Sequence, residues 1–484
     1  MRAEYWGAWR TVVVIGGLME SQGIQRLPGM RDLFEEENRR SRRMQDGLQS
    51  FLALYGYRTV DTPVVEPTDI FLRKSGGELA SQMYTFVEPG GHQVSLRPEF
   101  TSQVIRLFLQ EERSEPTPVR WQYAGPVFRY SPGETRYGRQ FTQVGAELIG
   151  AAGASAEAEV MAMACGALAA LGLGSQRMAL GDVGAVYGLL KQFKLSERAT
   201  YFLLYSMGEL RDGEDGLASV RARGQELGLF DSLERRGSME ALAQHLAASE
   251  AHGNGGSDGS IGVRTSQEVM ERLERKLQAA DSPEQLDNAL TFTQALAGMK
   301  GTPKDTLKAA RSLAESHKLD ASPLSSLEAS IDAFALHDMK SVEVSIDLCL
   351  ARDIAYYTGP VFEVWAGSGN GVRLAGGGRY DGLVKALGGS QDVPALGFAC
   401  TLELVMNALD EDAGDTRPAK QVLVTPRNDI AVKATLQAAA SLRLGGEVAA
   451  VSLDGAADQA SAKAQGFEAI IMVAEDGTNE RIWL

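Results

Sequence analysis

The spacing of apolar and polar positions divides this chain into segments of different type. Between Asp32 and Tyr57 apolar residues recur at helical spacing, which predicts a long helix that stops at Gly56. Short runs that alternate apolar with polar residues follow, separated by Gly, Pro and Ser, with one predicted helix over 100–110 among them. Strands with so few helices between them indicate an antiparallel sheet in a protein of α+β class.

Helical spacing dominates the middle of the chain, and strands alternate with helices at its end. Residues 155–171 are rich in Ala, Met and Leu and predict a buried helix, and the stretch from about 175 to 338 is typical of a helical insertion. Strands return between Val342 and Ala375. From Val422 to Ala474 strands and helices alternate, which predicts a small parallel α/β domain.

These segments predict a divided core with additions at both ends and in the middle. The predicted parts are an unstructured extension over 1–23, a core over 24–174 and 339–410, a helical insertion over 175–338, a linker over 411–420 and an α/β domain over 421–484. The apolar patch from Val12 to Leu18 is only about as long as the shortest core of a signal peptide. We therefore favour an extension upstream of a start at Met19, with a targeting segment as the alternative.

Composition narrows the class of protein. With 484 residues and 44% hydrophobic content, the chain is too long for one compact core. The 48 Lys and Arg against 63 Asp and Glu give a net charge of −15, which disfavours a dedicated nucleic-acid binder. Three distant cysteines exclude a disulfide scaffold and a Cys-based zinc site, so we expect a cytoplasmic protein.

The sequence also argues against a bound metal, a nucleotide cofactor and a membrane span. None of the five histidines stands in HxxxH or HxH spacing, so no metal centre is expected. The glycine patterns of Rossmann and P-loop sites are absent, and no cofactor is expected. No apolar run approaches the roughly 20 residues that a membrane span needs.

Four polar clusters interrupt the apolar strand pattern, and charges in such places are costly unless they are paired or bind a ligand. In one interpretation they bind a small zwitterion: Glu99 and Glu147 accept hydrogen bonds from an amine or imidazole, and Arg352 holds a carboxylate. The alternative is a network of Arg–Glu pairs on the exposed face of a sheet. The clusters are LRPEFT at 96–101 and the segments 127–147, 350–363 and 375–384.

In this order the clusters resemble the core of the class II aminoacyl-tRNA synthetases, specifically the histidyl-tRNA synthetase branch. Motifs 1, 2 and 3 of that family are similar to TP at 62–63, FR at 128–129 with RQFTQVGAE at 139–147, and PALGFACTLEL at 394–404. Its two histidine motifs resemble ARDIAYYTGPVFE at 351–363 and AGGGRYDGLV at 375–384. The resemblance implies a synthetase-like antiparallel core with a helical insertion, a tail like a truncated anticodon-binding domain, and a homodimer.

The resemblance also implies roles for individual residues, and these are expectations. Glu99, Thr101 and Gln143 would hold the α-amino group of histidine. Glu147 and Tyr357 would bind the imidazole ring, Arg352 would lie near the carboxylate, and Tyr380 would close the pocket. The candidate anion-binding residues are Arg129, which matches the α-phosphate arginine of motif 2, and Arg139.

The resemblance breaks where ATP would bind. Ser131 stands in the place of a motif 2 Glu, and Leu404 replaces the motif 3 Arg that binds the γ-phosphate in that family. Losing one preorganised donor of this kind typically costs about a hundredfold in rate. Phe100 replaces a small Gly, and the tail from Pro418 carries 6 Lys and Arg against 8 Asp and Glu.

With these departures, LRPEFT and GDVGAVYGLL at 181–190 resemble a paralogous family, the regulatory subunits of ATP phosphoribosyltransferase. The expectation is therefore a non-catalytic protein that binds L-histidine and assembles with a short-form catalytic subunit of that enzyme. Histidine feedback would be a coupling of typically about 1–3 kcal/mol between the two proteins. On this interpretation tRNA is not a partner. Two alternatives stay open: an active histidine–tRNA ligase, and a degenerate module without a ligand.

Overall fold

The computed structural model describes residues 24–73, 77–111, 117–131, 138–230, 260–261, 264–265, 281–350, 356–367, 371–409, 421–452 and 458–484. The chain divides into two units, Met1–Leu409 and Asp410–Leu484. The predicted extension over 1–23, the predicted linker over 411–420 and the candidate Arg352 lie outside the described residues.

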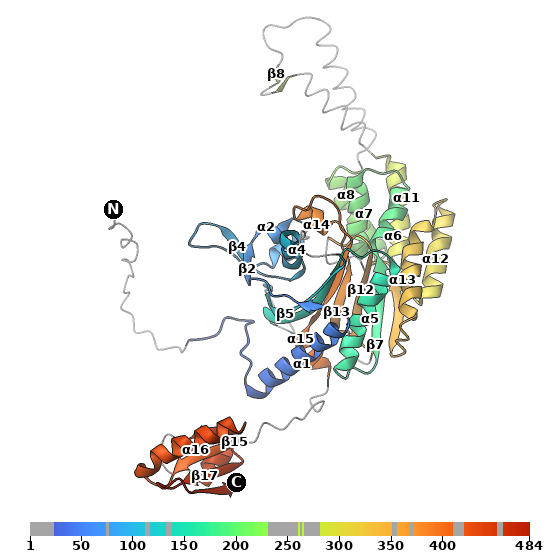
Figure 1. Ribbon diagram of the computed structural model, residues 1–484. Coiled ribbons are helices and arrows are strands. Elements are labelled where there is room, and N and C mark those ends of the chain that lie inside the picture. Colours follow the sequence, from blue (N-terminus) through green and yellow to red (C-terminus); the bar gives the residue numbers. More distant parts are fainter. Residues whose placement is uncertain are drawn as a thin grey trace, which may run out of the picture. The chain divides into compact units, whose positions relative to one another are not determined.

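The first unit is built on one large sheet (Figure 1). Among the described residues its nine strands run in the order β1-β5-β6-β14-β13-β12-β7-β11-β10. Two neighbouring pairs, β1 with β5 and β7 with β11, are parallel, and the other pairs are antiparallel. The predicted α+β class with an antiparallel-rich core is confirmed. The strands are β1 (Arg58–Thr59), β5 (Val119–Phe128), β6 (Gln140–Ile149), β7 (Gln176–Asp182), β10 (Lys300–Gly301), β11 (Val342–Asp347), β12 (Pro360–Ala366), β13 (Arg373–Arg379) and β14 (Ala395–Thr401).

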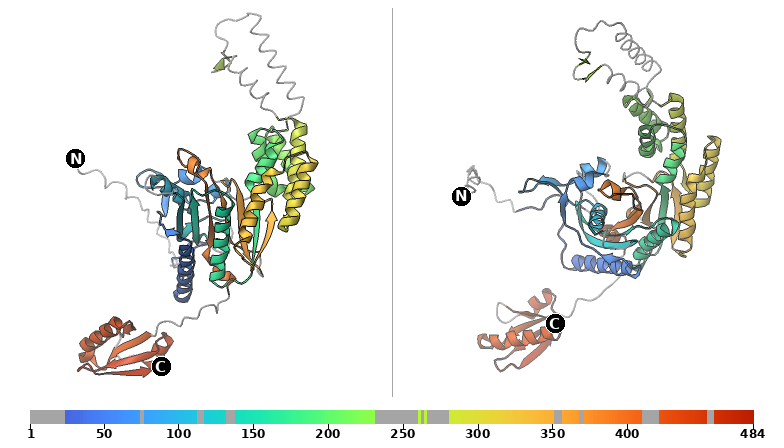
Figure 2. Two further views of the ribbon diagram at one scale, coloured as in Figure 1. Left: turned by 45° about the vertical axis from the view of Figure 1, so that its right-hand side comes forward. Right: turned by 45° about the horizontal axis from the view of Figure 1, so that its top comes forward.

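Side chains alternate between the two faces of this sheet, as the period of a strand requires. On β6 the even positions 144–148 belong to one apolar cluster, whereas Phe141 and Ile149 belong to the other. Gln143 and Glu147 share the second face with Phe141 and Ile149. Figure 2 shows helices on both sides of the curved sheet. The first cluster includes α1 (Glu35–Leu54), α5 (Ala154–Ala170) and α15 (Leu402–Ala408), and the second includes α4 (Thr101–Glu111) and α14 (Leu383–Ala386).

The predicted first helix is confirmed as α1. Glu35, Glu36 and Glu37 occupy its first turn, where their charges interact favourably with the positive end of the helix dipole. The helix gives way to Gly56, whose φ of 81° is left-handed and is readily adopted by glycine. Met44, Leu48 and Leu52 form its buried stripe against the sheet, so α1 covers the face opposite the candidate site.

The expectation of a helical insertion beginning at 175 needs a correction, because the segment opens with strand β7. This strand pairs with β12 on one side and β11 on the other and is buried along most of its length. The strand reads QRMALGD, so its apolar run is only Met178–Leu180, and so short a run does not separate a strand from a helix. A short antiparallel pair of strands, β8 (Ser260–Ile261) and β9 (Arg264–Thr265), lies between α8 and α11 in the chain. The helices that follow β7 are α6 (Val183–Lys191), α7 (Glu197–Leu210), α8 (Glu214–Glu226), α11 (Pro283–Ala297), α12 (Pro303–Ser316), η1 (Ser322–Leu324) and α13 (Ser325–Ala335).

A three-stranded sheet precedes α4 in the chain. Its strands run in the order β2-β4-β3, and both pairs are antiparallel. Because β4 leads through Arg97 and Pro98 to Glu99, this sheet fixes the start of the loop that carries the first candidate residue. The elements are β2 (Val65–Pro67), α2 (Asp69–Leu72), α3 (Gly77–Ser81), β3 (Thr85–Val87) and β4 (Gln93–Leu96).

The second unit has its own sheet, in the order β16-β15-β17-β18. The first three strands are parallel to one another, as predicted, but β18 is an antiparallel edge strand that the sequence reasoning missed. The elements are β15 (Gln421–Pro426), η2 (Asp429–Ala431), α16 (Val432–Leu444), β16 (Val448–Val451), α17 (Gln459–Ala464), β17 (Ala469–Val473) and β18 (Asn479–Trp483). No helix in the described part of the chain is long and apolar enough to cross a membrane.

Candidate active site

A pocket of about 260 Å³ lies on the sheet face that also carries α4. Strands β5, β6, β14, β13 and β12 supply much of its lining, and the loop before α4 and the segments around Tyr356 and Tyr380 supply more. Six of the candidate residues come together here although they are far apart in the chain. They are Glu99, Thr101, Arg129, Gln143, Tyr357 and Tyr380.

Glu147 is a buried carboxylate directly behind the pocket lining, with 1% of its surface exposed, and its hydrogen-bond donors are lining residues. It accepts hydrogen bonds from Thr101 Oγ1 at 2.7 Å, from the Tyr123 hydroxyl at 3.1 Å and from the Tyr380 hydroxyl. Burial raises the pKa of Glu147 to about 7, and the charge on Glu99 adds to that effect while the hydroxyl donors oppose it. Near neutral pH this carboxyl group can therefore accept a hydrogen bond from an imidazole N–H and exchange a proton with it.

Glycines bring the neighbouring strands close to Glu147. A Cβ placed on Gly397 would lie 1.7 Å from Glu147 Oε2, and one on Gly377 would lie 2.2 Å from the Gly397 carbonyl oxygen. No other residue type fits at either position without displacing the backbone or the carboxylate. Within the glycine run 376–378, Gly377 thus permits the close approach of β13 to β14. Gly397 on β14 leaves space for the Glu147 carboxylate.

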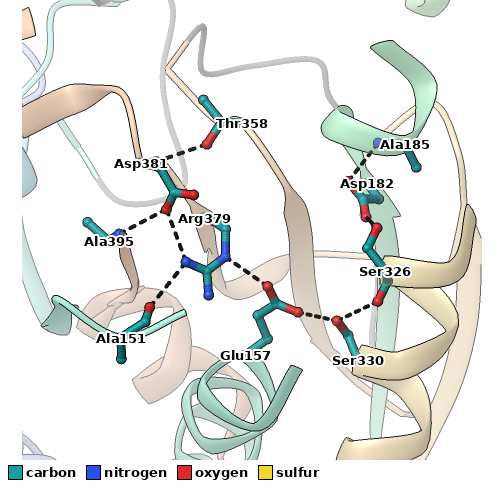
Figure 3. A network of polar contacts seen from close by, with 10 residues as sticks. All are labelled: Ala151, Glu157, Asp182, Ala185, Ser326, Ser330, Thr358, Arg379, Asp381 and Ala395. Atoms are coloured by element: carbon teal, nitrogen blue, oxygen red, sulfur yellow. Dashed lines mark hydrogen bonds and ion pairs between the residues drawn. The ribbon is translucent and has the colours of Figure 1, made fainter. Parts of the chain in front are cut away.

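The two residues that flank Tyr380 in the chain, Arg379 and Asp381, belong to a polar network that reaches α5 and α13 (Figure 3). Arg379 donates to Glu157 Oε1 at 2.8 Å and to Asp381 Oδ1 at 3.0 Å. Asp381 Oδ1 also accepts the Ala395 N–H at 2.9 Å, which ties the segment after β13 to the start of β14. Bonds on both sides of Tyr380 therefore fix its backbone, and with it the hydroxyl that faces Glu147.

The network continues from Glu157 into the helices after β7. The Ser330 hydroxyl of α13 donates to Glu157 Oε2, and the Ser326 hydroxyl donates to Asp182 Oδ2 at 2.6 Å. Asp182 also accepts the Ala185 N–H at 3.0 Å and so caps α6. Burial raises the pKa of Asp182 to about 6. One chain of polar contacts thus joins Arg379, the residue before Tyr380, to α13 (Figure 3).

Glu99 and Gln143 supply acceptors at another part of the pocket. Glu99 accepts the Ser102 N–H with both carboxylate oxygens, at 3.1 and 3.2 Å. Burial raises the pKa of Glu99, whereas the Ser102 contacts and the charge of Arg129 lower it. Among the described residues, the buried Oε1 of Gln143 has no hydrogen-bond partner. A buried acceptor facing a pocket costs free energy unless a donor reaches it, so this position fits an ammonium or amide group of a ligand.

Two arginines line the pocket. Arg129 follows β5, donates to the Pro98 carbonyl at 2.9 Å and lies 5.4 Å from the centre of the Phe141 ring. Arg373 begins β13 and forms an ion pair with Glu363 of β12, which also lines the pocket. The site therefore combines buried carboxylates with guanidinium groups, which suits a ligand that carries charges of both signs.

Arg139 does not line the pocket. Its Nε donates to the Ser131 carbonyl at 3.0 Å, and its guanidinium lies 4.5 Å from the centre of the Tyr130 ring. Phe100, which stands where the resemblance has a small Gly, stacks on Tyr123 with ring centres 4.4 Å apart, within the second apolar cluster. Arg352 falls outside the described residues.

Sequence reasoning missed Tyr123, Tyr356 and Arg373. Tyr123 lies on β5 with its hydroxyl on Glu147, and Tyr356 packs edge-on against Tyr380 with ring centres 5.6 Å apart. The signal for Tyr123 was its odd position in an alternating strand, on the same face as Trp121 and Val127. Among the described residues, no group of three His, Cys, Asp or Glu side chains is placed to hold a metal ion.

Comparison with known proteins identifies the family. The histidyl-tRNA synthetase family model matches residues 29–255 and 261–405. The chain belongs to the histidyl-tRNA synthetase family. A histidine–tRNA ligase of Methanocaldococcus jannaschii is 27% identical to it over 94% of this chain and 93% of the relative. One from Pyrococcus furiosus is 29% identical over 89% of this chain and 86% of the relative.

Solved structures share the fold of this synthetase-family chain. A Bacillus halodurans protein, described as an ATP phosphoribosyltransferase regulatory subunit/histidyl-tRNA synthetase, matches with a TM-score of 0.64 and 22% identity and covers 93% of this chain and 98% of its own. The apo histidyl-tRNA synthetase of S. aureus matches with a TM-score of 0.55 and 21% identity, covering 95% and 97%. At these identities the likeness concerns the fold alone.

The expectation of a non-catalytic regulatory subunit is wrong. Relatives that are 26–29% identical over 80–94% of this chain carry the name histidine–tRNA ligase, which is the name of an enzyme. The sequence argument gave most weight to Leu404, which lies in the apolar core with 8% of its surface exposed. That argument left out Arg373, because no motif of the resemblance assigned a role to it.

Proposed function

We propose that this protein is a histidine–tRNA ligase, which activates L-histidine with ATP and transfers it to tRNA. The observation that carries the proposal is the environment of Glu147. This carboxylate is buried, has a pKa of about 7 and is surrounded by the hydroxyl groups of Thr101, Tyr123 and Tyr380. Membership of the histidyl-tRNA synthetase family and the names of the relatives support the same activity.

Histidine would bind with its ring toward Glu147 and its ammonium group toward Glu99 and Gln143. The imidazole N–H donates to the Glu147 carboxylate, and a buried site that pairs this N–H discriminates strongly against side chains that lack it. The orphaned Gln143 Oε1 accepts a proton of the ammonium group. Tyr356, Tyr357 and Tyr380 supply aromatic walls, since all three line the pocket.

Activation requires an arginine where negative charge develops. A carboxylate oxygen of histidine attacks the α-phosphorus of ATP, the bond to pyrophosphate breaks, and histidyl-adenylate forms. The 3′-terminal ribose hydroxyl of the tRNA then attacks the acyl carbon, and AMP leaves. Arg129 lies near Glu99, since its charge lowers the pKa of that carboxyl group, and it would stabilise the α-phosphate in the first step.

This function replaces the partners first expected. The catalytic subunit of ATP phosphoribosyltransferase was expected only under the regulatory interpretation and is no longer a proposed partner. L-histidine is kept, now as a substrate, and ATP and tRNA are the other two substrates. A ligase of this kind meets its tRNA in the cytoplasm, where we place its activity. The homodimer implied by the class II resemblance stays a prediction.

The test is ATP–pyrophosphate exchange with purified full-length protein. Exchange should depend on L-histidine and should be absent with glutamine or phenylalanine, because neither places a ring N–H beside Glu147. Glu147→Gln should lower kcat/KM for histidine, whereas the exposed control Glu226→Gln on α8 should match the wild type. Histidine binding without any exchange would refute the proposal.

A further inference from the structure

The pocket has an acidic inner region and a cationic outer edge. On β6, Glu147 and Gln143 are four residues apart, which is about 13 Å along a strand. The sheet register places Gly397 opposite Glu147 and Thr401 opposite Gln143. Arg129 directly follows Phe128, which pairs with Gln140, so the Gln143 end of the strands is the end nearer Arg129.

Arg373 lies at that same outer edge. On β13, Ala375 pairs with Cys400 of β14, so Arg373 lies beside the end of β14 that carries Thr401. A bulge between Val364 and Trp365 shifts the register of β12 and β13 here, and Arg373 pairs with Trp365. The outer edge therefore holds Arg129 on one side of the pocket and Arg373 on the other.

Position 404 cannot supply a cation to this edge, because Leu404 is apolar and lies in the core. ATP carries about four negative charges, and the transfer of its α-phosphate leaves a pyrophosphate whose charge must be stabilised. Among the described lining residues, Arg129 and Arg373 are the cations. If Arg129 binds the α-phosphate, Arg373 is the lining cation that can bind the β- and γ-phosphates.

We propose that Arg373 binds the β- and γ-phosphates of ATP and supplies the charge that position 404 lacks. This proposal rests on the proposed ligase function. Arg373 would bind phosphate beside its ion pair with Glu363, because its charged guanidinium lines the pocket and its side chain is partly open to solvent. Glu363 would then hold the guanidinium in place beside Gly376, where both side chains lie.

A purely structural role for Arg373 makes a different prediction. Its side chain is 46% exposed, and an ion pair so accessible to solvent contributes little to folding. If bridging β12 and β13 were its only role, Arg373→Leu would leave nucleotide affinity unchanged. If Arg373 binds phosphate, the loss of nucleotide affinity caused by Arg373→Leu must grow with the number of phosphates on the nucleotide.

The experiment measures the binding of ATP, ADP and AMP by isothermal calorimetry, and that of L-histidine as a check on the pocket. Arg373→Leu should raise the Kd of ATP by about 10- to 100-fold, the effect of losing a hydrogen bond to a charged group, and leave the Kd values of AMP and histidine within about twofold. Arg373→Lys should recover part of the affinity, because it keeps the charge but loses the fork.

A matched control uses Arg177→Leu. Arg177 is an exposed arginine on β7, paired with Trp365 in the same cross-strand row as Arg373 but outside the pocket lining. Strand β12 lies between them, so the two arginines are two strand spacings apart, roughly 10 Å, at which distance salt screens most of the field of Arg177. Its loss should leave ATP affinity unchanged, so an equal effect of both substitutions would contradict a direct contact.

The outcomes separate this inference from the proposed function. In one outcome the wild type catalyses exchange while Arg373→Leu leaves the ATP affinity unchanged. That result overturns the inference about Arg373 and leaves the proposed ligase function in place. ATP affinity that depends on Arg373 in a protein without exchange activity supports the phosphate site and refutes the ligase. Equal losses of ATP and AMP affinity also overturn the inference, because they place Arg373 away from the outer phosphates.

Discussion

Replacing Glu147 by Gln should strengthen the fold while weakening histidine binding. The substitution keeps the shape of the side chain and removes its charge. Burial holds the pKa of Glu147 at about 7 in the folded protein, above the ordinary 4.5. Between these two values the folded chain holds a proton that the unfolded chain does not, so stability is greatest at low pH and is lost as pH rises toward 7.

The size of the stability effect follows from the two pKa values. Their difference corresponds to about 3 kcal/mol, an upper limit for the cost of ionising Glu147 inside the folded protein. At pH 8 the wild type bears that cost and Glu147→Gln does not, so the variant should be more stable by up to about 3 kcal/mol. Near pH 5 the side chain is uncharged in both folded proteins, and their stabilities should nearly converge.

Histidine binding should change in the opposite direction. A hydrogen bond to a charged group contributes about 1.5–3 kcal/mol, and a neutral amide recovers only part of it, so the Kd of histidine should rise about tenfold or more at pH 8. Urea unfolding at pH 5 and pH 8 and calorimetric titration with histidine are the assays. A variant that binds histidine like the wild type, or whose stability keeps the wild-type pH dependence, would show that Glu147 does not have the assigned role.

Three further substitutions test neighbouring parts of the site. Gly397→Ala should abolish histidine binding in calorimetry, because the added carbon overlaps the Glu147 carboxylate, whereas Gly174→Ala, which meets nothing within 4 Å, should bind normally. Arg379→Lys should raise the KM of histidine at least about threefold without changing that of ATP, since it loosens the hold on the neighbouring tyrosine; equal changes in both would indicate general damage. Asp182→Asn should flatten the fall in stability between pH 4 and 6, because burial raises the pKa of this aspartate to about 6 from 3.8 and the wild type loses up to about 3 kcal/mol across that window; an unchanged urea midpoint profile would contradict this.

Motif order was enough to predict the fold and the gathering of the pocket residues. Glu99, Gln143 and Tyr380 come from three distant segments and line one cavity. Such residues can be assigned in advance because alternation fixes the face of each strand and the family order fixes which strands are neighbours. Strand β7 was missed because its apolar run, Met178–Leu180, is too short to show the period of a strand.

The function was misjudged for a different physical reason. The absence of an arginine at Leu404 says nothing about charge supplied by another strand, and the pairing that brings Arg373 to the same pocket is a tertiary fact. Net charge is also a coarse guide to RNA binding, because it sums over the whole surface. RNA contacts depend on local charge, and four arginines fall within residues 39–43 of this acidic chain.

The most direct measurement of the central claim is aminoacylation. The full-length protein is incubated with ATP, labelled L-histidine and total tRNA, and acid-precipitable label is followed over time, with Glu147→Gln as the impaired variant. The account predicts that histidine becomes attached to tRNA, that the reaction requires ATP, and that the variant is slowed at least about tenfold. Protein that binds histidine and ATP yet charges no tRNA would contradict it.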